Sequence, residues 1–385
     1  MTSTKNPFMV HYRTSGEAET AQKVVGYLDN AWEFEVKVLG FAPPPPDNGV
    51  CGPNDLFDVF ILRGQRSCCV DVISEQIVTA WGARASFMIL DPWGPYGGES
   101  LNHTIGHEFN HACQAEDDWH EIGISFEMTA TYIEQYFGEG CASCIRDFQG
   151  RPDWSVLWFD DYNSEYMYGS AIYFNFLKDR YFPADEGFPA RVWFNARNIP
   201  NPYVNKPNFV DGTDAILAPL GSSFMDSVPV FERWRYFAGS RDDGGHFKKW
   251  PLPSTQLPFF IGDADIKLHA AIRLADTVYK VDPPLMLLGS AYIEVLQDQG
   301  GRESFNVSVS TTPPEGSAFR LVLQAVPGVV AGSDGDTIDL STGSARVPFA
   351  SGGKRTLIIT LMPAAAFDPD NQSGQTFPVS VHLAP

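Results

Sequence analysis

The sequence predicts an α+β protein in which a mixed domain, residues 1–260, is followed by an all-β sandwich, residues 261–385. The chain has 385 residues, which is more than one typical domain contains, so we expect two domains. Before residue 260 several segments carry apolar residues at helical spacing, whereas the last third consists of short alternating stretches separated by Gly, Pro, Asp and Ser. The latter pattern is typical of an immunoglobulin-like or jelly-roll sandwich.

The first part of the mixed domain, about residues 1–98, is predicted to contain short strands around one long helix. Three stretches rich in Phe, Ile, Val and Leu are the predicted strands: FMVHYRTS, LFDVFILRG and ASFMILDP. Apolar residues at helical spacing predict a helix over GEAETAQKVVGYLDNAWEFEVKVLG. A loop must follow this helix, because neither a helix nor a strand tolerates PPPPDNGVCGPND.

The second part, about residues 99–260, is predicted to be mainly helical. Residues 103–137 fit two helices joined by the polar segment AEDDWHEIG, and residues 164–182 fit another. The Pro- and Gly-rich remainder gives no clear pattern. In the sandwich the expected strands are IKLHAAIRLA, SAYIEVLQ, ESFNVSVST, FRLVLQAVPG, KRTLIITLMP and FPVSVHLAP.

Composition excludes several classes of protein. Hydrophobic residues make up 44% of the chain and aromatic residues 13%, which is enough for packed cores, so the chain is not disordered. The formal net charge of -20 and the lack of a basic stripe argue against a nucleic-acid partner. No run of about 18 apolar residues occurs, so we expect no membrane span. The sequence leaves the oligomeric state open.

The cysteines favour an extracellular location. Six cysteines form an even set, as in proteins of oxidising compartments, although the N-terminal residues lack the apolar core of a signal peptide. We therefore expect a secreted protein whose leader is absent from this sequence; a cytosolic protein is the alternative. Cys51 is expected to bond to Cys68 or Cys69, while Cys141 and Cys144 form either a local disulfide or two free thiols.

The segment HEFNH, His107 to His111, has the pattern that carries chemistry. Residues four apart lie on one face of a helix, so His107 and His111 can direct both imidazoles at one ion. Glu108 stands beside them, in the position of a group that accepts a proton. This spacing predicts a catalytic Zn²⁺ site.

A catalytic zinc ion usually has three protein ligands, so a third must follow downstream. Glu127, sixteen residues after His111 in a second predicted helix, is the expected ligand. Asp117 is the alternative, because another class of zinc peptidase places its third ligand six residues after the second His. That class requires Gly three residues after the second His, where this chain has Gln114. His120 is a further candidate.

These residues together predict hydrolysis of a peptide bond. Zinc lowers the pKa of its water toward neutrality, Glu108 accepts the proton, and the activated water attacks a carbonyl that the metal polarises. Glu108 then passes the proton to the leaving amine. The oxyanion needs a second donor, for which Tyr168 is the expected residue, with His120 and Tyr166 as alternatives.

Other features are expected to support this site. Glu134 and Thr131, beyond Glu127 on the same predicted helix, are candidates to orient the imidazoles through their second nitrogen. The strand ASFMIL could hold an extended peptide by edge pairing.

Two acidic segments, SDGDTID at Asp334 to Asp339 and DPDNQSG from Asp368, have oxygen-rich chemistry suited to structural Ca²⁺, although solvated turns are the more common interpretation.

Several motifs resemble the secreted gluzincin-type metalloproteases of predatory and soil bacteria. The shared segments are GHEFNHACQ, AEDDW and EMTATYIEQ at the centre, HYRTSG, VVGYLDNAW, LGFAPP and DVFIL before it, and GSAYIEV after it. The resemblance implies a zincin-like metallopeptidase domain with zinc ligands His107, His111 and Glu127 and the base Glu108. Met128 departs from the family, which usually has Gly there.

The expected function is therefore a zinc-dependent endopeptidase that acts on extracellular proteins or peptides. One alternative is a non-catalytic binding or adhesion protein with a structural zinc, against which the retention of Glu108 argues. Another is a zinc amidohydrolase whose substrates are amides other than peptide bonds of proteins.

Overall fold

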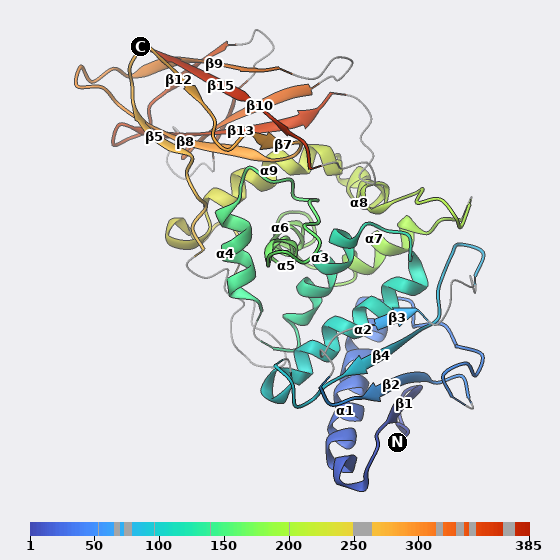
Figure 1. Ribbon diagram of the computed structural model, residues 1–385. Coiled ribbons are helices and arrows are strands. Elements are labelled where there is room, and N and C mark those ends of the chain that lie inside the picture. The colour runs from blue at the N-terminus through green and yellow to red at the C-terminus, as the bar shows by residue number, and fades with distance from the viewer. Residues whose placement is uncertain are drawn as a thin grey trace. The chain divides into compact units, whose positions relative to one another are not determined.

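The structure, a computed structural model, combines helices with several β-sheets, as the predicted mixed class requires (Figure 1). It describes residues 1–52, 54–64, 70–72, 79–95, 97–138, 140–199, 201–248, 264–312, 319–328, 335–338, 344–364 and 374–385. No helix in this described part combines the length and the apolar character needed to cross a bilayer.

The chain divides into two compact units that alternate along the sequence. The first contains Met1–Cys141 and Leu177–Ser223, and the second contains Ala142–Phe176, Phe224–Lys248 and the described part of Ile261–Pro385. The units thus cross the boundary expected near residue 260, because two helical segments before it associate with the strand-rich end of the chain.

The sheet of the first unit has the order β1-β2-β4-β3. β1 (Phe8–His11), β2 (Phe57–Ile61) and β4 (Ser86–Leu90) are parallel and confirm the three predicted strands. β3 (Val70–Val72) runs antiparallel to β4 and was not predicted. Since β4 lies between β2 and β3, the expectation that the strand ASFMIL is a free edge is wrong: its ladder positions are already paired on both sides.

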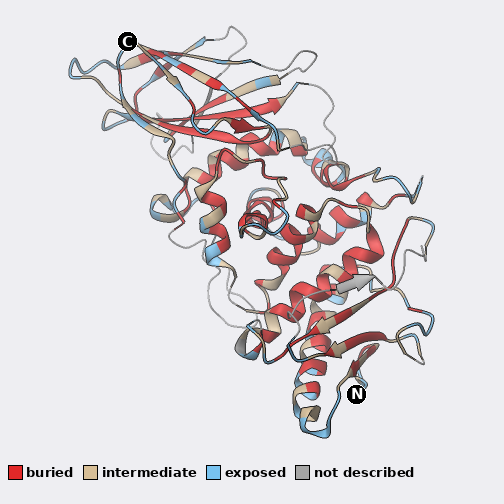
Figure 2. Cartoon of the chain, viewed as in Figure 1, coloured by how far each residue is buried: buried red, intermediate tan, exposed pale blue. Residues whose placement is uncertain are grey.

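Two helices cover this sheet. α1 (Ala18–Ala31) continues into the π-helical segment η2 (Trp32–Leu39), which ends at Gly40 in the left-handed region, φ 83°. α2 (Leu101–Asp117) is buried along most of its length (Figure 2). The ring of Phe109 in α2 contacts aromatic rings from the sheet and from η2, those of Phe8, Phe57 and Trp32. This aromatic contact fixes α2 against the strands.

A second layer of helices packs on α2. α3 (Gly123–Glu134) follows α2 after a five-residue connection, residues 118–122, which confirms the predicted helix pair. α7 (Phe188–Ala196) and α8 (Phe209–Leu217) pack on each other, and α7 also contacts α2. Trp193 of α7 donates its indole N–H to the hydroxyl of Thr129 in α3 at 3.0 Å, which ties α3 to α7.

The second unit begins with short helices. The helix expected over residues 164–182 is instead two helices, α5 (Tyr166–Gly169) and α6 (Ile172–Arg180), and the last residues of α6, from Leu177, belong to the first unit. The break coincides with close packing, because a Cβ on Gly169 would lie 2.1 Å from the carbonyl oxygen of Cys144 in α4 (Ala142–Gly150). α9 (Phe224–Tyr236) completes the helices of this unit.

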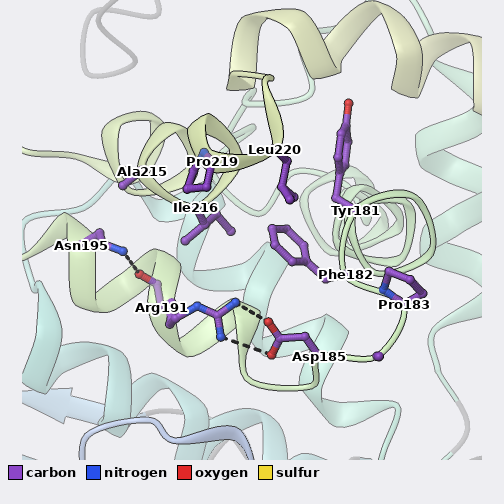
Figure 3. A pocket seen from close by; sticks show the side chains of 11 residues that line it. Tyr181, Phe182, Pro183, Asp185, Arg191, Asn195, Ala215, Ile216, Pro219 and Leu220 are labelled. Carbon is purple, nitrogen blue, oxygen red and sulfur yellow. Dashed lines mark hydrogen bonds and ion pairs between the residues drawn. The ribbon is translucent and has the colours of Figure 1, made fainter.

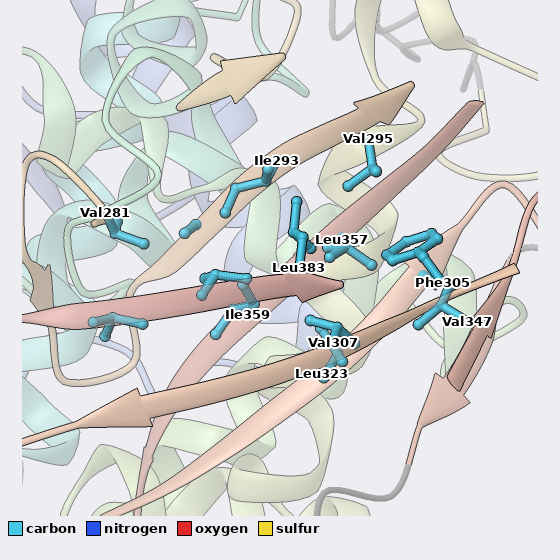
Figure 4. Close-up of a cluster of buried hydrophobic side chains, with 14 of the residues drawn as sticks. Val281, Ile293, Val295, Phe305, Val307, Leu323, Val347, Leu357, Ile359 and Leu383 are labelled. Carbon is cyan, nitrogen blue, oxygen red and sulfur yellow. The ribbon is translucent and has the colours of Figure 1, made fainter. Parts of the chain in front are cut away.

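Two sheets form the rest of the second unit. One has the order β11-β10-β13-β8-β5 and the other β12-β9-β15-β6, with β14 and β7 paired separately. Side chains from both sheets join one buried hydrophobic cluster, which includes Ile293, Val307 and Ile359 (Figure 4). The six predicted strands are confirmed within β5 (Ala270–Arg273), β8 (Ser290–Leu296), β9 (Ser304–Thr311), β10 (Phe319–Val326), β13 (Lys354–Pro363) and β15 (Val379–Ala384).

The shorter strands described in this unit were not predicted from the sequence. They are β6 (Thr277–Lys280), β7 (Leu285–Met286), β11 (Asp336–Ile338), β12 (Ser344–Pro348) and β14 (Thr376–Phe377).

A buried polar network explains why α4 and α9 belong with the strands. Arg235 of α9 is fully buried and donates to the carboxylate of Glu232 at 3.0 and 3.1 Å and to the amide oxygen of Gln149 in α4 at 2.8 Å. Tyr292 of β8 donates its hydroxyl proton toward Glu232 Oε2 at 2.8 Å. One ion pair thus connects three segments, and breaking such a buried pair is strongly destabilising.

The cysteines match the sequence expectation in part. Cys141 and Cys144 form a disulfide, one of the two alternatives predicted for them. Cys51 is a free thiol, so the bond expected for it is not formed, and its expected partners, Cys68 and Cys69, lie outside the described residues. Cys113 in α2 is a buried free thiol.

Candidate metal centre

Three predicted ligands converge between α2 and α3. One helical turn separates His107 and His111, and their Nε2 atoms lie 3.1 Å apart. The Oε2 atom of Glu127, from α3, lies 3.2 Å from Nε2 of His107 and 3.7 Å from Nε2 of His111. The sequence spacing therefore brings the expected triad together.

The dimensions of this triad fit a zinc ion. Ligand atoms about 2.0–2.2 Å from zinc at tetrahedral angles are separated from one another by roughly 3.3 Å. The separations of 3.1, 3.2 and 3.7 Å bracket that value. The donor set of two imidazoles and one carboxylate is also one that zinc accepts.

Both imidazoles are oriented through their second nitrogen. Nδ1 of His107 lies 2.8 Å from Oε2 of Glu134, and Nδ1 of His111 lies 2.8 Å from Oε1 of Gln114. The amide nitrogen of Gln114 in turn donates to the carbonyl of Phe126 at 3.2 Å, which fixes the amide with its oxygen toward His111. Since the Nδ1 atoms face acceptors, the Nε2 atoms point at the metal position.

Only one of the two predicted orienting residues has this role. Glu134 does contact His107, whereas the hydroxyl of Thr131 is buried without a hydrogen-bond partner in the described part of the chain. Gln114 was not predicted, although its position three residues after His111 in a helix placed it within reach.

Protonation in the triad follows from its geometry. Burial alone would lower the pKa of His107, but hydrogen bonds to Glu127 and Glu134 raise that pKa well above its usual value. Burial alone would raise the pKa of Glu127, but hydrogen bonds from His107 and His111 hold it well below its usual range. Without a metal, a proton on His107 thus compensates the carboxylates, and metal binding must displace it.

The predicted base, Glu108, and the predicted oxyanion donor, Tyr168, belong to different units. Glu108 lies in α2, directly after His107, and is 6% exposed. Tyr168 is a half-buried residue of α5 in the second unit, where Tyr166 is fully buried and donates its hydroxyl proton to the carbonyl of Ser155 at 2.9 Å. The roles of Glu108 as base and of Tyr168 as oxyanion donor stay predictions.

The alternative ligands, Asp117 and His120, make other contacts. Asp117 Oδ1 accepts a hydrogen bond from Nε of Arg197 at 2.7 Å, so its carboxylate is held by an ion pair. His120 is in the connection after α2, where burial and the charge of Arg84 lower its pKa. Neither joins the group of donor atoms that His107, His111 and Glu127 form within 4.8 Å.

A buried acid supports the metal helix from the other side. Glu35 of η2 is fully buried, and its Oε2 accepts a hydrogen bond from the amide of Asn110 at 3.0 Å. Burial raises the pKa of Glu35 well above its usual value, which favours its neutral form. Asn110 lies between the two histidines on α2, and its partner is 75 residues away in the sequence, which no local pattern could reveal.

Close packing sets the distance between α2 and the turn after α3. A Cβ on Gly106 would lie 2.2 Å from the ring of Phe137, so only glycine permits this contact next to His107. The side chain of Asn102 donates to the carbonyl of Phe137 at 2.7 Å, which anchors the same turn to the start of α2.

A separate pocket of about 510 Å³ lies in the first unit (Figure 3). Its walls include Phe182, Ile216 and Leu220, and at its rim Arg191 forms an ion pair with Asp185. None of the three candidate ligands lines this pocket, so it is distinct from the candidate metal centre.

The two acidic segments proposed for calcium fall mostly outside the described residues. Asp334, Asp339 and the segment from Asp368 belong to the parts that the structure leaves undescribed. Asp336, in between, forms an ion pair with Arg355.

Comparison with known proteins does not identify this centre. No protein-family model matches the chain, and a search of curated proteins finds no significant match. A functional assignment therefore depends on the residues of the site themselves.

Proposed function

We propose that the protein is a zinc-dependent endopeptidase of the gluzincin type. The observation that carries this proposal is the convergence of His107 Nε2, His111 Nε2 and Glu127 Oε2, separated by 3.1 to 3.7 Å. Two histidines from one helix and a glutamate from the next are the ligand set of that class, to which the sequence motifs also point.

The fold proposed with this function is a zincin-like domain followed by a β-sandwich. The zincin-like domain is supported by the sheet with one antiparallel strand, by α2, which packs on that sheet, and by α3, which packs on α2. Support for the β-sandwich comes from two sheets that share one hydrophobic cluster. Since β3 and not β4 is at the edge of the sheet, we transfer the proposed pairing with an extended substrate to β3.

Glu108 is the residue that moves protons in this proposal. Zinc held by the triad would polarise the scissile carbonyl and make a water molecule acidic near neutral pH. Glu108, on the same helix as both histidines, accepts the proton of that water and donates it to the leaving amine.

The number of ligands favours catalysis over a structural role for the metal. Structural zinc sites usually have four protein ligands, whereas the group found in the described part of the chain has three. This counts against the binding or adhesion protein considered from the sequence. An amidohydrolase acting on non-protein amides would use the same centre, so substrate assays must separate it from an endopeptidase.

The proposed substrates are extracellular proteins. The disulfide between Cys141 and Cys144 is compatible with secretion, since oxidising compartments preserve such bonds.

The decisive experiment compares zinc content and casein cleavage for the wild type and Glu108→Gln. This variant is expected to bind one zinc ion at the centre, as the wild type does, and to lose cleavage by at least about 100-fold, the usual contribution of a general base. Equal cleavage by both proteins would overturn the proposal. Cleavage of small amides but not of casein would favour the amidohydrolase.

A second comparison tests the ligand set. Glu127→Ala is expected to lose zinc from the centre, whereas Asp117→Ala, which removes only the partner of Arg197, is expected to retain it. The opposite result would favour Asp117 as the ligand.

A further inference from the structure

A second group of potential metal ligands lies at the start of β2. One donor atom each from Asp47, Cys51 and Asp58 lies within 4.8 Å of the others. Asp47 and Cys51 belong to the Pro- and Gly-rich loop before β2, and Asp58 is the second residue of that strand. The group shares no residue with the histidine-glutamate centre.

Backbone N–H groups of the loop hold the carboxylate of Asp47. Oδ1 of Asp47 accepts the N–H of Gly49 at 2.8 Å, and Oδ2 accepts the N–H of Cys51 at 2.7 Å. These bonds fix the Asp47 carboxylate against the turn that carries the Cys51 thiol. Each carboxylate oxygen retains a lone pair for a further partner.

Asp58 supplies the observation that calls for a cation. Its side chain is 1% exposed, and its Oδ1 lies 2.5 Å from Nε2 of His11 in β1. Its Oδ2 is buried with no hydrogen-bond partner among the described residues. Both oxygens face the loop, since a Cβ on Gly52 would lie 3.3 and 3.4 Å from them. A buried carboxylate oxygen without a partner is costly unless a cation compensates it.

We propose that Asp47, Cys51 and Asp58 bind a second divalent transition-metal ion, for which Zn²⁺ is the best match, and that this ion fastens the loop to β2. A thiolate ligand disfavours Ca²⁺ and Mg²⁺, whereas two carboxylates disfavour Cu(I), and zinc accepts both kinds of donor. His11 acts as a positioning residue, because its hydrogen bond to Oδ1 directs Oδ2 at the ion.

Cobalt distinguishes this centre from the first one. Co²⁺ added alone to the metal-free full chain should give the near-ultraviolet charge-transfer band of a cobalt-thiolate bond, which a site of two histidines and a glutamate cannot produce. Cys51→Ser is expected to lose the band. Cys113→Ala, which removes the other described free thiol, and Glu127→Ala, which disables the first centre, are expected to retain it.

Two measurements protect the test against a folding defect. Cys51→Ser should still bind one equivalent of Zn²⁺ at the first centre, which reports that the first unit is folded. In the wild type, Zn²⁺ should slow alkylation of Cys51 by at least about 10-fold, measured by peptide mass spectrometry without any substitution. His11→Ala is expected to weaken the cobalt-thiolate band without abolishing it.

Three results would overturn the assignment. They are the absence of a cobalt-thiolate band in the wild type, its persistence in Cys51→Ser, and mass-spectrometric detection of Cys51 in a disulfide. None of these results depends on proteolytic activity, so failure of this proposal and failure of the peptidase proposal can be told apart.

Discussion

Glu134 is expected to control the affinity of the first metal centre without being a ligand. Its Oε2 lies 2.8 Å from Nδ1 of His107, which holds the imidazole in place and makes its Nε2 a better donor to a metal. Loss of such a partner typically weakens metal binding 10- to 100-fold. Glu134→Ala should therefore raise the Kd for zinc by roughly 10- to 100-fold, equivalent to about 1.4–2.8 kcal/mol of binding free energy.

The corresponding contact on the other histidine allows the effects of two substitutions on zinc affinity to be compared. Gln114 offers a neutral amide oxygen to Nδ1 of His111, also at 2.8 Å. Hydrogen bonds to charged groups are roughly twice as strong as neutral ones, so Gln114→Ala should raise the Kd only about 3- to 10-fold. Glu134→Gln, which can keep an acceptor but loses the charge, should fall between the wild type and Glu134→Ala.

The assay is competition for zinc between the protein and a chromophoric chelator at fixed pH. Thr131→Val is the control, because Thr131 is on the same helix and its buried hydroxyl has no hydrogen-bond partner in the described chain. The reasoning is refuted if Glu134→Ala binds zinc within about twofold of the wild type, or if Thr131→Val weakens binding as much.

Three further predictions concern the stability of the first unit. Glu35→Gln, which keeps a hydrogen-bonding partner for Asn110, should lower the unfolding free energy in urea by less than about 1.5 kcal/mol, and Glu35→Ala by about 2–5 kcal/mol; equal losses would show that this hydrogen bond does not stabilise the fold. Gly106→Ala should lower both Tm and zinc content because its Cβ meets a ring at 2.2 Å, whereas Gly26→Ala, in an open part of α1, should raise Tm slightly. Burial raises the pKa of both Glu116 and Asp117 to about 7, so the folded state binds more protons than the unfolded state, and stability should fall as the pH rises from about 4 to 7. Asp117→Asn should remove about 3–4 kcal/mol of this fall, and an unchanged slope of unfolding free energy against pH would refute the assignment.

Local sequence patterns were sufficient to predict the helix pair and to bring its three candidate ligands together. Helical geometry alone brings His107 and His111 together, and the apolar spacing around Glu127 predicted the helix that delivers it. The same local rules found β1, β2 and β4. They failed for α7 and α9, where Pro189 stands in the first turn and Pro229 lies inside the helix. Proline there is compatible with a helix that tertiary contacts support, although it disfavours one in a sequence pattern.

Contacts between distant residues could not be predicted in this way. Glu35 meets Asn110 across 75 residues, and Arg235 meets Gln149 across 86. Each is a polar pair enclosed by the core, and a single sequence shows only two ordinary polar residues. The second of these pairs joins α9 to α4, and the hydrogen bond from Tyr292 to Glu232 joins α9 to β8, so no local sequence pattern marks the grouping of both helices with the strands.

The protonated state of His107 links the metal centre to the stability of its surroundings. In the metal-free centre its imidazolium lies between Glu127 and Glu134, so one proton offsets negative charge that zinc would otherwise compensate. Removing Glu127 also removes one of the groups that raise the pKa of His107, so the imidazole can return to its neutral form without leaving an unpaired charge. Glu127→Ala is therefore expected to lose the metal while remaining folded. Loss of zinc in that variant would then report the loss of a ligand and not unfolding.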